Sequence, residues 1–255
     1  MASNKTNAGN FFEDFEIGLV LRHATPRTIT EGDVSLYTAL YGNRFALQSA
    51  DVFAIDCGLQ AAPIDDLLVF HIVFGKTVPD VSLNAVANLG YADIKFVTPV
   101  YPGDSVQTVS EVIGLKENSN GKTGVVYVRS TGINQMGEVV LDYVRWVMVR
   151  KRDPGAAAPA PVVPDLVASV AASDLVIPQG LDFSGYDFVQ AGEAHRWPDY
   201  QIGEKIDHVD GVTVEEAEHM MATRLWQNTS KVHFDSTLRA DGRRLIYGGH
   251  VISMA

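Results

Sequence analysis

The segment from Leu225 to Asp235 gathers Asn228, His233 and Asp235 within a short stretch of chain. A histidine has a free pKa near about 6.5, so its imidazole can both accept and return a proton near neutral pH. Asn228 can orient a water molecule or cap a turn, and Asp235 can orient His233 or cap a following helix. A lone histidine is more often structural, so the assignment of proton transfer to His233 depends on its neighbours.

A weaker version of the same pattern occurs earlier, from Leu40 to Gln48. It offers Asn43 and Gln48 in place of Asn228 and His233. Gln48 can form hydrogen bonds but cannot exchange a proton. The two segments indicate a duplicated unit in which only the second copy keeps an ionisable base.

Two helices are expected to position the first copy. Thr30, followed three residues later by Asp33, resembles a capping box before an apolar-periodic stretch. A second helix is predicted from Ile64 to Thr77, where acidic residues open the first turn and the following residues are apolar on every face. A helix of that kind has to be wrapped by sheet.

The strands that would wrap it follow in the sequence and are rich in Val, Thr and Tyr. They are expected at Asp93 to Thr98, Asp104 to Glu117, Lys122 to Asn134 and Glu138 to Arg152. Helices first and consecutive antiparallel strands afterwards are typical of the α+β class.

A break in composition divides the chain. Residues 154–180 hold five of the eleven prolines and a run of alanines, which is typical of an extended linker. We therefore predict an N-terminal unit over residues 1–153, a Pro/Ala-rich linker over 154–190 and the start of a second unit over 191–255.

The overall charge and the cysteine content exclude several classes. Twenty basic against thirty-one acidic residues give a net charge of −11, which opposes binding to nucleic acid. The single Cys57 excludes an internal disulfide framework and a Cys-rich zinc site. No apolar stretch reaches the about 20 residues that span a bilayer, and Met1 to Gly9 lacks the apolar core of a signal peptide. These features predict a cytoplasmic protein with no membrane partner.

Particular residues carry a resemblance to a known family. Phe96 to Val106 resembles the F-x-x-P-V-x-x-G-D turn of MaoC-type hot-dog dehydratases, in which Pro99 and Pro102 stiffen the turn and Gly103 supplies an unusual backbone angle. The Asn228 to Asp235 segment resembles the hydratase motif G-D-x-N-P-x-H-x-D. The resemblance implies a tandem, or double, hot-dog fold.

One branch of that family, the mesaconyl-CoA hydratases or β-methylmalyl-CoA dehydratases, resembles this chain over nearly its whole length. The segments that carry the likeness are Asn10 to Phe15, His23 to Asp33, Leu68 to Thr77 and Gln227 to Phe234. The resemblance implies reversible hydration of an acyl-CoA substrate, 2-methylfumaryl-CoA, without a metal or redox cofactor, as a step of the ethylmalonyl-CoA pathway. Analogy implies a homodimer.

The resemblance also implies the roles of individual residues. Gly249 stands at the family's helix start and is expected to offer its amide to the developing thioester oxyanion. His250 replaces a methionine there and is either a supporting donor or part of the helix surface. The substrate's free carboxylate requires a cation. The candidates for contact with substrate are Asp235, Lys231, Arg44, Arg243, Arg244 and His250.

Other functions remain open at this stage. An (R)-specific enoyl-CoA hydratase would use the same motif on a neutral substrate. A hot-dog thioesterase requires a carboxylate near the central helix, for which Asp65 is the candidate. A non-catalytic acyl-CoA-binding subunit would be consistent with the amides at Asn43, Gln48 and Asn228.

The second unit is expected to lack strands within this sequence. In the first unit about 85 residues follow the central helix start, whereas Gly249 lies close to the final residue, Ala255. We expect the missing strands in a further segment or a separate chain, giving an intact length of about 330 to 350 residues if duplicated units share element lengths.

Overall fold

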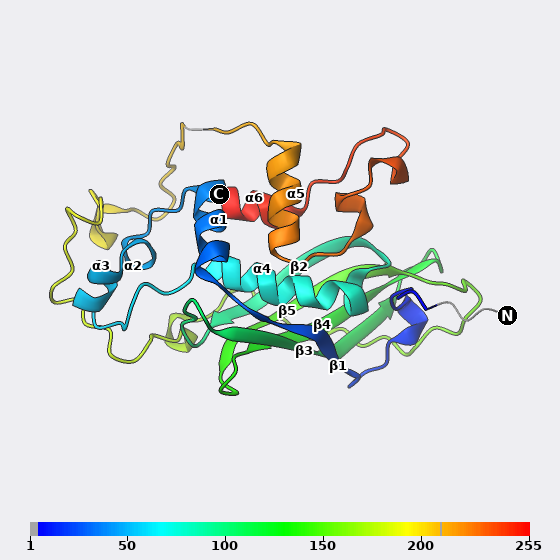
Figure 1. Cartoon of the computed structure of the whole chain (residues 1–255). Coiled ribbons are helices and arrows are strands. Elements are labelled where there is room, and N and C mark those ends of the chain that lie inside the picture. The colour runs from blue at the N-terminus through cyan, green and yellow to red at the C-terminus, as the bar shows by residue number, and fades with distance from the viewer. Residues whose placement is uncertain (1–4, 210) are drawn as a thin grey trace.

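A computed structural model describes residues 5–209 and 211–255 (Figure 1). The first four residues of the expected leaderless N-terminus therefore lie outside the described residues. The strands are β1 (Val20–Thr28), β2 (Ala85–Phe96), β3 (Ser105–Glu117), β4 (Thr123–Ile133) and β5 (Val139–Arg150). The α-helices are α1 (Glu31–Tyr41), α2 (Ala46–Ser49), α3 (Asp51–Asp56), α4 (Asp66–Thr77), α5 (Glu216–Leu225) and α6 (Gly248–Met254). Short helical turns are η1 (Phe12–Asp14), η2 (Val78–Ser82), η3 (Ala172–Asp174), η4 (Trp197–Asp199), η5 (Lys231–His233) and η6 (Ser236–Leu238).

One antiparallel sheet with the strand order β1-β3-β4-β5-β2 packs along α4, which confirms the expected helix wrapped by sheet (Figure 1). Every residue of α4 from Leu68 to Thr77 is buried. A helix that is apolar on all sides is stable only when all sides are covered. The sheet covers one side of α4, and α5 and α6 lie on the other (Figure 1).

The local signals predicted several boundaries correctly. Thr30 caps α1 and accepts a hydrogen bond from the Asp33 amide, completing the expected capping box. The predicted second helix begins two residues later than expected, at Asp66, because the Asp65 carboxylate caps it by accepting from the Leu67 amide. Gly103 has a φ of 102°, as the turn requires, and the next strand opens directly after Asp104.

Two strands were underestimated because both lie at sheet edges. Strand β1 was not predicted at all, since it is polar, contains Pro26 and pairs only with β3 across a register shift between His23 and Arg27. Strand β2 begins eight residues before the predicted Asp93, in an Ala, Asn and Gly stretch of low strand propensity. Pairing with β5 overrides that propensity.

The irregular stretch is longer than the predicted linker. Between β5 and α5 the described residues form only η3, η4 and one isolated bridge, in which Val162 and Leu115 exchange backbone hydrogen bonds of 2.8 Å. Regular structure resumes at Glu216. The division of the chain into three parts stays a prediction.

The turn after α5 is docked directly on the backbone of α4 at Gly75. A Cβ on Gly75 would overlap the carbonyl oxygen of Trp226 and would lie 3.3 Å from the Asn228 amide nitrogen. Lys76 donates to the side chain of Gln227 beside this contact. Only a residue without a side chain lets the turn approach this closely, so Gly75 sets where the Asn228 segment lies.

We expect Gly75→Ala to lower the free energy of unfolding by about 3 kcal/mol, at the upper end for overpacking, because the obstructing atoms are backbone atoms that cannot rotate away. The matched control is Gly32→Ala in α1, where an added Cβ meets only the Thr30 hydroxyl at 3.5 Å. Equilibrium denaturant unfolding measures both. Equal stability of the two variants would contradict the steric role of Gly75.

Candidate active site

His233 is held in one tautomer by the backbone. It lies at the end of η5, is 8% exposed, and its Nδ1 is 2.7 Å from the carbonyl oxygen of Leu245. A carbonyl oxygen only accepts, so Nδ1 carries the proton and Nε2 keeps a free lone pair. Burial lowers the pKa of His233, partly opposed by the Leu245 carbonyl. The imidazole is therefore a neutral base at pH 7.

His233 lines a cavity of about 310 Å³ between the C-terminal segment and the five-stranded sheet. A hollow of this size suits a small acyl group. Its wall combines two parts of the chain that are distant in sequence. The C-terminal segment contributes Asn228, Ser230, Val232, His233, Leu245, Ile246, Tyr247, Gly248 and Ile252. The N-terminal part contributes Phe74, Val78, Ser82, Ala85, Val86, Ala87, Asn88, Tyr91, Arg145 and Val147.

Asn228 shares the cavity wall with His233 and is 4% exposed. Its Oδ1 accepts a hydrogen bond of 2.9 Å from the Ser230 amide, as in the turn-capping interpretation. Among the hydrogen bonds of residues 5–209 and 211–255, none engages its Nδ2. The oxygen is thus committed to the turn, and the amide N–H groups are left as donors.

The helix start expected to form the oxyanion hole lies beside the cavity. Gly248, the first residue of α6, lines the cavity, whereas Gly249 is buried behind it with His71 Cε1 2.6 Å from where its Cβ would be. Amides in the first turn of a helix have no intrahelical acceptor. The donor role of Gly249 stays a prediction, and Gly248 is the neighbouring amide that the cavity reaches.

Two residues expected to contact substrate, His250 and Asp235, lie outside the cavity wall. His250 is neither a cavity residue nor helix surface: it is 1% exposed, and its Nδ1 is 2.8 Å from the Tyr41 hydroxyl, because α6 turns this face toward α1. Asp235 is exposed and accepts from the Thr237 amide at 2.9 Å, capping η6. It forms no hydrogen bond with His233, so the capping interpretation holds.

None of the four basic candidates for the substrate carboxylate lines the His233 cavity, and their contact with substrate stays a prediction. Lys231 and Arg243 are exposed on the surface. Arg244 forms an ion pair with Glu216 on α5. Arg44 lines a separate, open pocket. These residues were proposed because they lie close to the two motif segments in sequence, and the fold places none of them in the cavity wall.

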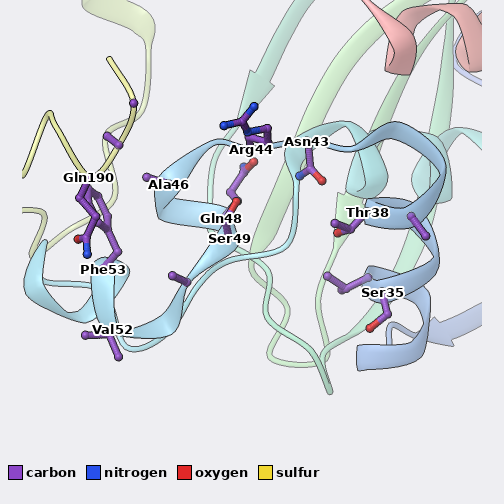
Figure 2. Close-up of a pocket in the computed structure, with 15 residues that line it drawn as sticks. Ser35, Thr38, Asn43, Arg44, Ala46, Gln48, Ser49, Val52, Phe53 and Gln190 are labelled. Carbon is purple, nitrogen blue, oxygen red and sulfur yellow. The ribbon is translucent and has the colours of Figure 1, made fainter. Parts of the chain in front are cut away.

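The open pocket holds the degenerate first copy of the motif (Figure 2). Figure 2 shows Ser35 and Thr38 of α1 together with Asn43, Arg44 and Gln48 of the following segment. The Asn43 amide donates to the Asp65 carboxylate at 2.9 Å. The pocket lining contains no histidine, aspartate or glutamate, so this copy offers no proton-transfer group.

Arg145 is the cavity residue that sequence reasoning missed. It has no exposed surface, and its Nη2 donates to the Thr77 hydroxyl at 2.7 Å and the Ser82 hydroxyl at 3.4 Å. Its guanidinium carbon lies 4.4 Å from the centre of the Phe74 ring. Its Nε and Nη1 have no hydrogen-bond partner, and none of the ion pairs within the described residues involves it.

The sequence held a signal for Arg145. Side chains alternate between the two faces of a strand. Arg145 is in phase with Tyr143 and Val147 on β5, both of which are buried. The alternation of side chains along the strand therefore predicts that Arg145 is a buried charge.

Three further histidines form the packing beneath the site. His219 accepts from the Tyr247 amide at 2.9 Å, and His71 contacts Trp226 with ring centres 4.2 Å apart. Burial lowers the pKa of His71 to about 3, helped by His250, and lowers that of His219 to about 4, helped by His233 and His250. In the part of the chain that the structure describes, no group of three or more His, Cys, Asp or Glu side chains could hold a metal ion.

The sheet wrapped around α4 defines the α+β hot-dog class, and comparison with solved structures places the chain in the double hot-dog group. It superposes on a MaoC domain protein dehydratase from Chloroflexus aurantiacus with a TM-score of 0.96 and 64% identity, covering 99% of this chain and 73% of that one. A Mycobacterium tuberculosis protein with a double hot-dog fold, 23% identical, superposes with a TM-score of 0.68 over 97% of this chain and 74% of that one.

The family model for mesaconyl-CoA hydratase matches residues 2–253, so the chain belongs to the mesaconyl-CoA hydratase family. The mesaconyl-CoA hydratase of Cereibacter sphaeroides is 69% identical over 98% of this chain and 73% of its own length. The β-methylmalyl-CoA dehydratase of Chloroflexus aurantiacus is 64% identical over 99% of this chain and 73% of its own length. None of the helices among residues 5–209 and 211–255 is long and apolar enough to cross a membrane.

The buried histidines predict loss of stability in acid. A histidine whose pKa is lowered by folding binds its proton more readily in the unfolded chain, so stability falls as the pH drops below about 6.5. Between pH 7 and pH 5 we expect the free energy of unfolding of His219→Gln to fall by about 2 kcal/mol less than that of the unsubstituted protein. The side-chain oxygen of the glutamine can still accept from the Tyr247 amide.

Denaturant unfolding at both pH values measures this difference. The comparison with the parent protein cancels groups that titrate in the same range, such as Asp66, whose pKa burial and Asp65 raise to about 6. His195→Gln, on the exposed surface, is the matched control. If the free energy of unfolding depends on pH identically in all three proteins, folding does not hold His219 in its neutral form.

Proposed function

We propose that this protein is a hydro-lyase that catalyses the reversible hydration of mesaconyl-CoA to β-methylmalyl-CoA. The observation that carries the proposal is His233, fixed with Nδ1 protonated and Nε2 free at the wall of an acyl-sized cavity. The names of the two curated relatives, at 69% and 64% identity, supply the substrate.

Hydration requires a proton to leave water and another to reach the substrate. In the proposed mechanism, Nε2 of His233 takes a proton from water while the water oxygen bonds to the carbon next to the free carboxylate. The electron pair of the double bond moves toward the thioester, forming an enolate. The carbon next to the thioester then takes a proton, which the His233 imidazolium supplies, and the neutral base is restored.

Asn228 and the start of α6 support this step. The amide of Asn228 orients the water through its free N–H groups, while its oxygen holds the turn. The enolate oxygen needs backbone donors, and the first-turn amides of α6 at Gly248 and Gly249 are the candidates. None of these steps requires a cofactor. Cofactor independence, a homodimeric assembly and a cytoplasmic location stay predictions.

The thioesterase alternative depends on a free carboxylate near the start of α4. Asp65 is committed there, since it caps the helix and accepts from Asn43. A thiol reagent distinguishes the two reactions, because hydrolysis releases coenzyme A and hydration does not. We expect loss of enoyl-thioester absorbance without release of thiol.

We expect His233→Ala to lower kcat for mesaconyl-CoA by about two to four decades, the usual contribution of a general acid–base group. Initial rates of enoyl-thioester loss measure this, with His195→Gln as a control that keeps full activity. Near-parental activity in His233→Ala would remove the histidine from the mechanism.

Variants of Asn228 show whether this residue orients the water molecule or transfers a proton. We expect Asn228→Ala to cost less than His233→Ala, because it removes an orienting group and not a proton carrier. In Asn228→Asp the carboxylate oxygen can still accept from the Ser230 amide but the donor N–H groups are lost. Activity of Asn228→Asp at or above the parental level would show that the N–H groups are not required and that a carboxylate works there.

A further inference from the structure

The cavity contains a positive charge for which residues 5–209 and 211–255 provide no paired counter-charge. Arg145 is fully buried, and within the part of the chain that the structure describes it forms no ion pair and leaves Nε and Nη1 without hydrogen-bond partners. Burying a guanidinium without compensation is costly, and buried charges are normally paired. The two hydroxyls of Thr77 and Ser82 hold Nη2 but bring no negative charge.

The position of Arg145 connects this charge to the reacting centre. Its guanidinium lies over Phe74, the Phe74 ring stacks on Tyr247 with centres 5.6 Å apart, and Tyr247 contacts His233 with ring centres 5.3 Å apart. All four side chains line the same cavity. An anion bound by Arg145 would therefore share the cavity with the group that His233 acts on.

We propose that Arg145 binds the free carboxylate of the acyl group through its unpartnered N–H groups and so makes the enzyme select dicarboxylic enoyl thioesters over neutral ones. This inference rests on the proposed function and adds the residue that determines its specificity. A charge-assisted hydrogen bond in a buried site is among the strongest that a protein can offer.

The alternative anion, a phosphate of coenzyme A, fits this position less well. Coenzyme A is longer than the cavity, and its phosphates are strongly hydrated, whereas Arg145 has no exposed surface. The carboxylate of a four-carbon acyl chain is small and sits one bond from the carbon that receives water. Small side-chain rotations at the wall, which are common on binding, would bring it into contact.

The test compares two substrates of the same shape. Mesaconyl-CoA carries a carboxylate where (E)-2-methylbut-2-enoyl-CoA carries a methyl group. We expect Arg145→Met to lower the ratio of their kcat/KM values by about 30-fold or more, the loss seen when one partner of a buried charge pair is removed. Arg150→Met, on the exposed end of the same strand, is the matched control and is expected to leave the ratio unchanged.

The outcomes separate this inference from the proposed function. If the parent protein hydrates mesaconyl-CoA and Arg145→Met keeps the parental ratio, Arg145 is not the carboxylate receptor. If the parent protein hydrates neither substrate, the proposed function itself is wrong. Replacement of a buried charge by methionine is often tolerated, and circular dichroism checks the fold. If Arg145→Met does not fold, Arg145→Lys is used instead, because lysine keeps the charge but lacks the planar guanidinium. A lowered ratio of the two kcat/KM values in Arg145→Lys supports the inference, and a parental ratio overturns it.

Discussion

The position of the C-terminal segment, and with it the cavity, depends on the close approach of two backbones at Gly75. This approach lets the Trp226–Asn228 turn rest on the central helix, where Trp226 is fully buried against His71. Every cavity residue from the C-terminal segment lies in that turn or follows it in the chain. If the turn were held further from α4 by even one methyl group, Asn228 and His233 would move away from the face formed by β2 and β5.

This docking gives the two copies of the motif different surroundings. The second copy lies over the buried helix, in a hollow lined in part by aromatic rings, where burial lowers the pKa of His233. The first copy lines a separate pocket (Figure 2), and its Asn43 amide donates to the Asp65 carboxylate. The copy that contains His233 thus lies against the helix and sheet that the N-terminal part of the chain forms.

Features encoded over a few residues were predictable from the sequence. The Thr30 and Asp33 capping box, the Gly103 turn and the apolar α4 are each determined by neighbours in the chain. His233 was found in the same way, through its own motif. The missed feature depends on contacts distant in sequence: the packing of β5 on α4 brings Arg145 into the same cavity wall as His233. The arginines near the motif in sequence do not line that cavity. Local patterns identify the candidate base but not the residues that the fold brings into the same cavity.

The central claim, that a buried neutral His233 is the base of hydration, is tested most directly by the pH dependence of kcat/KM for mesaconyl-CoA. We predict a plateau at neutral pH and a tenfold decline per pH unit below a single pKa that is lower than about 6.5, because burial opposes protonation of the imidazole. The protein's folded fraction is measured at each pH. A rate that stays flat to pH 4.5 in folded protein, or that rises as the pH falls, would contradict the claim.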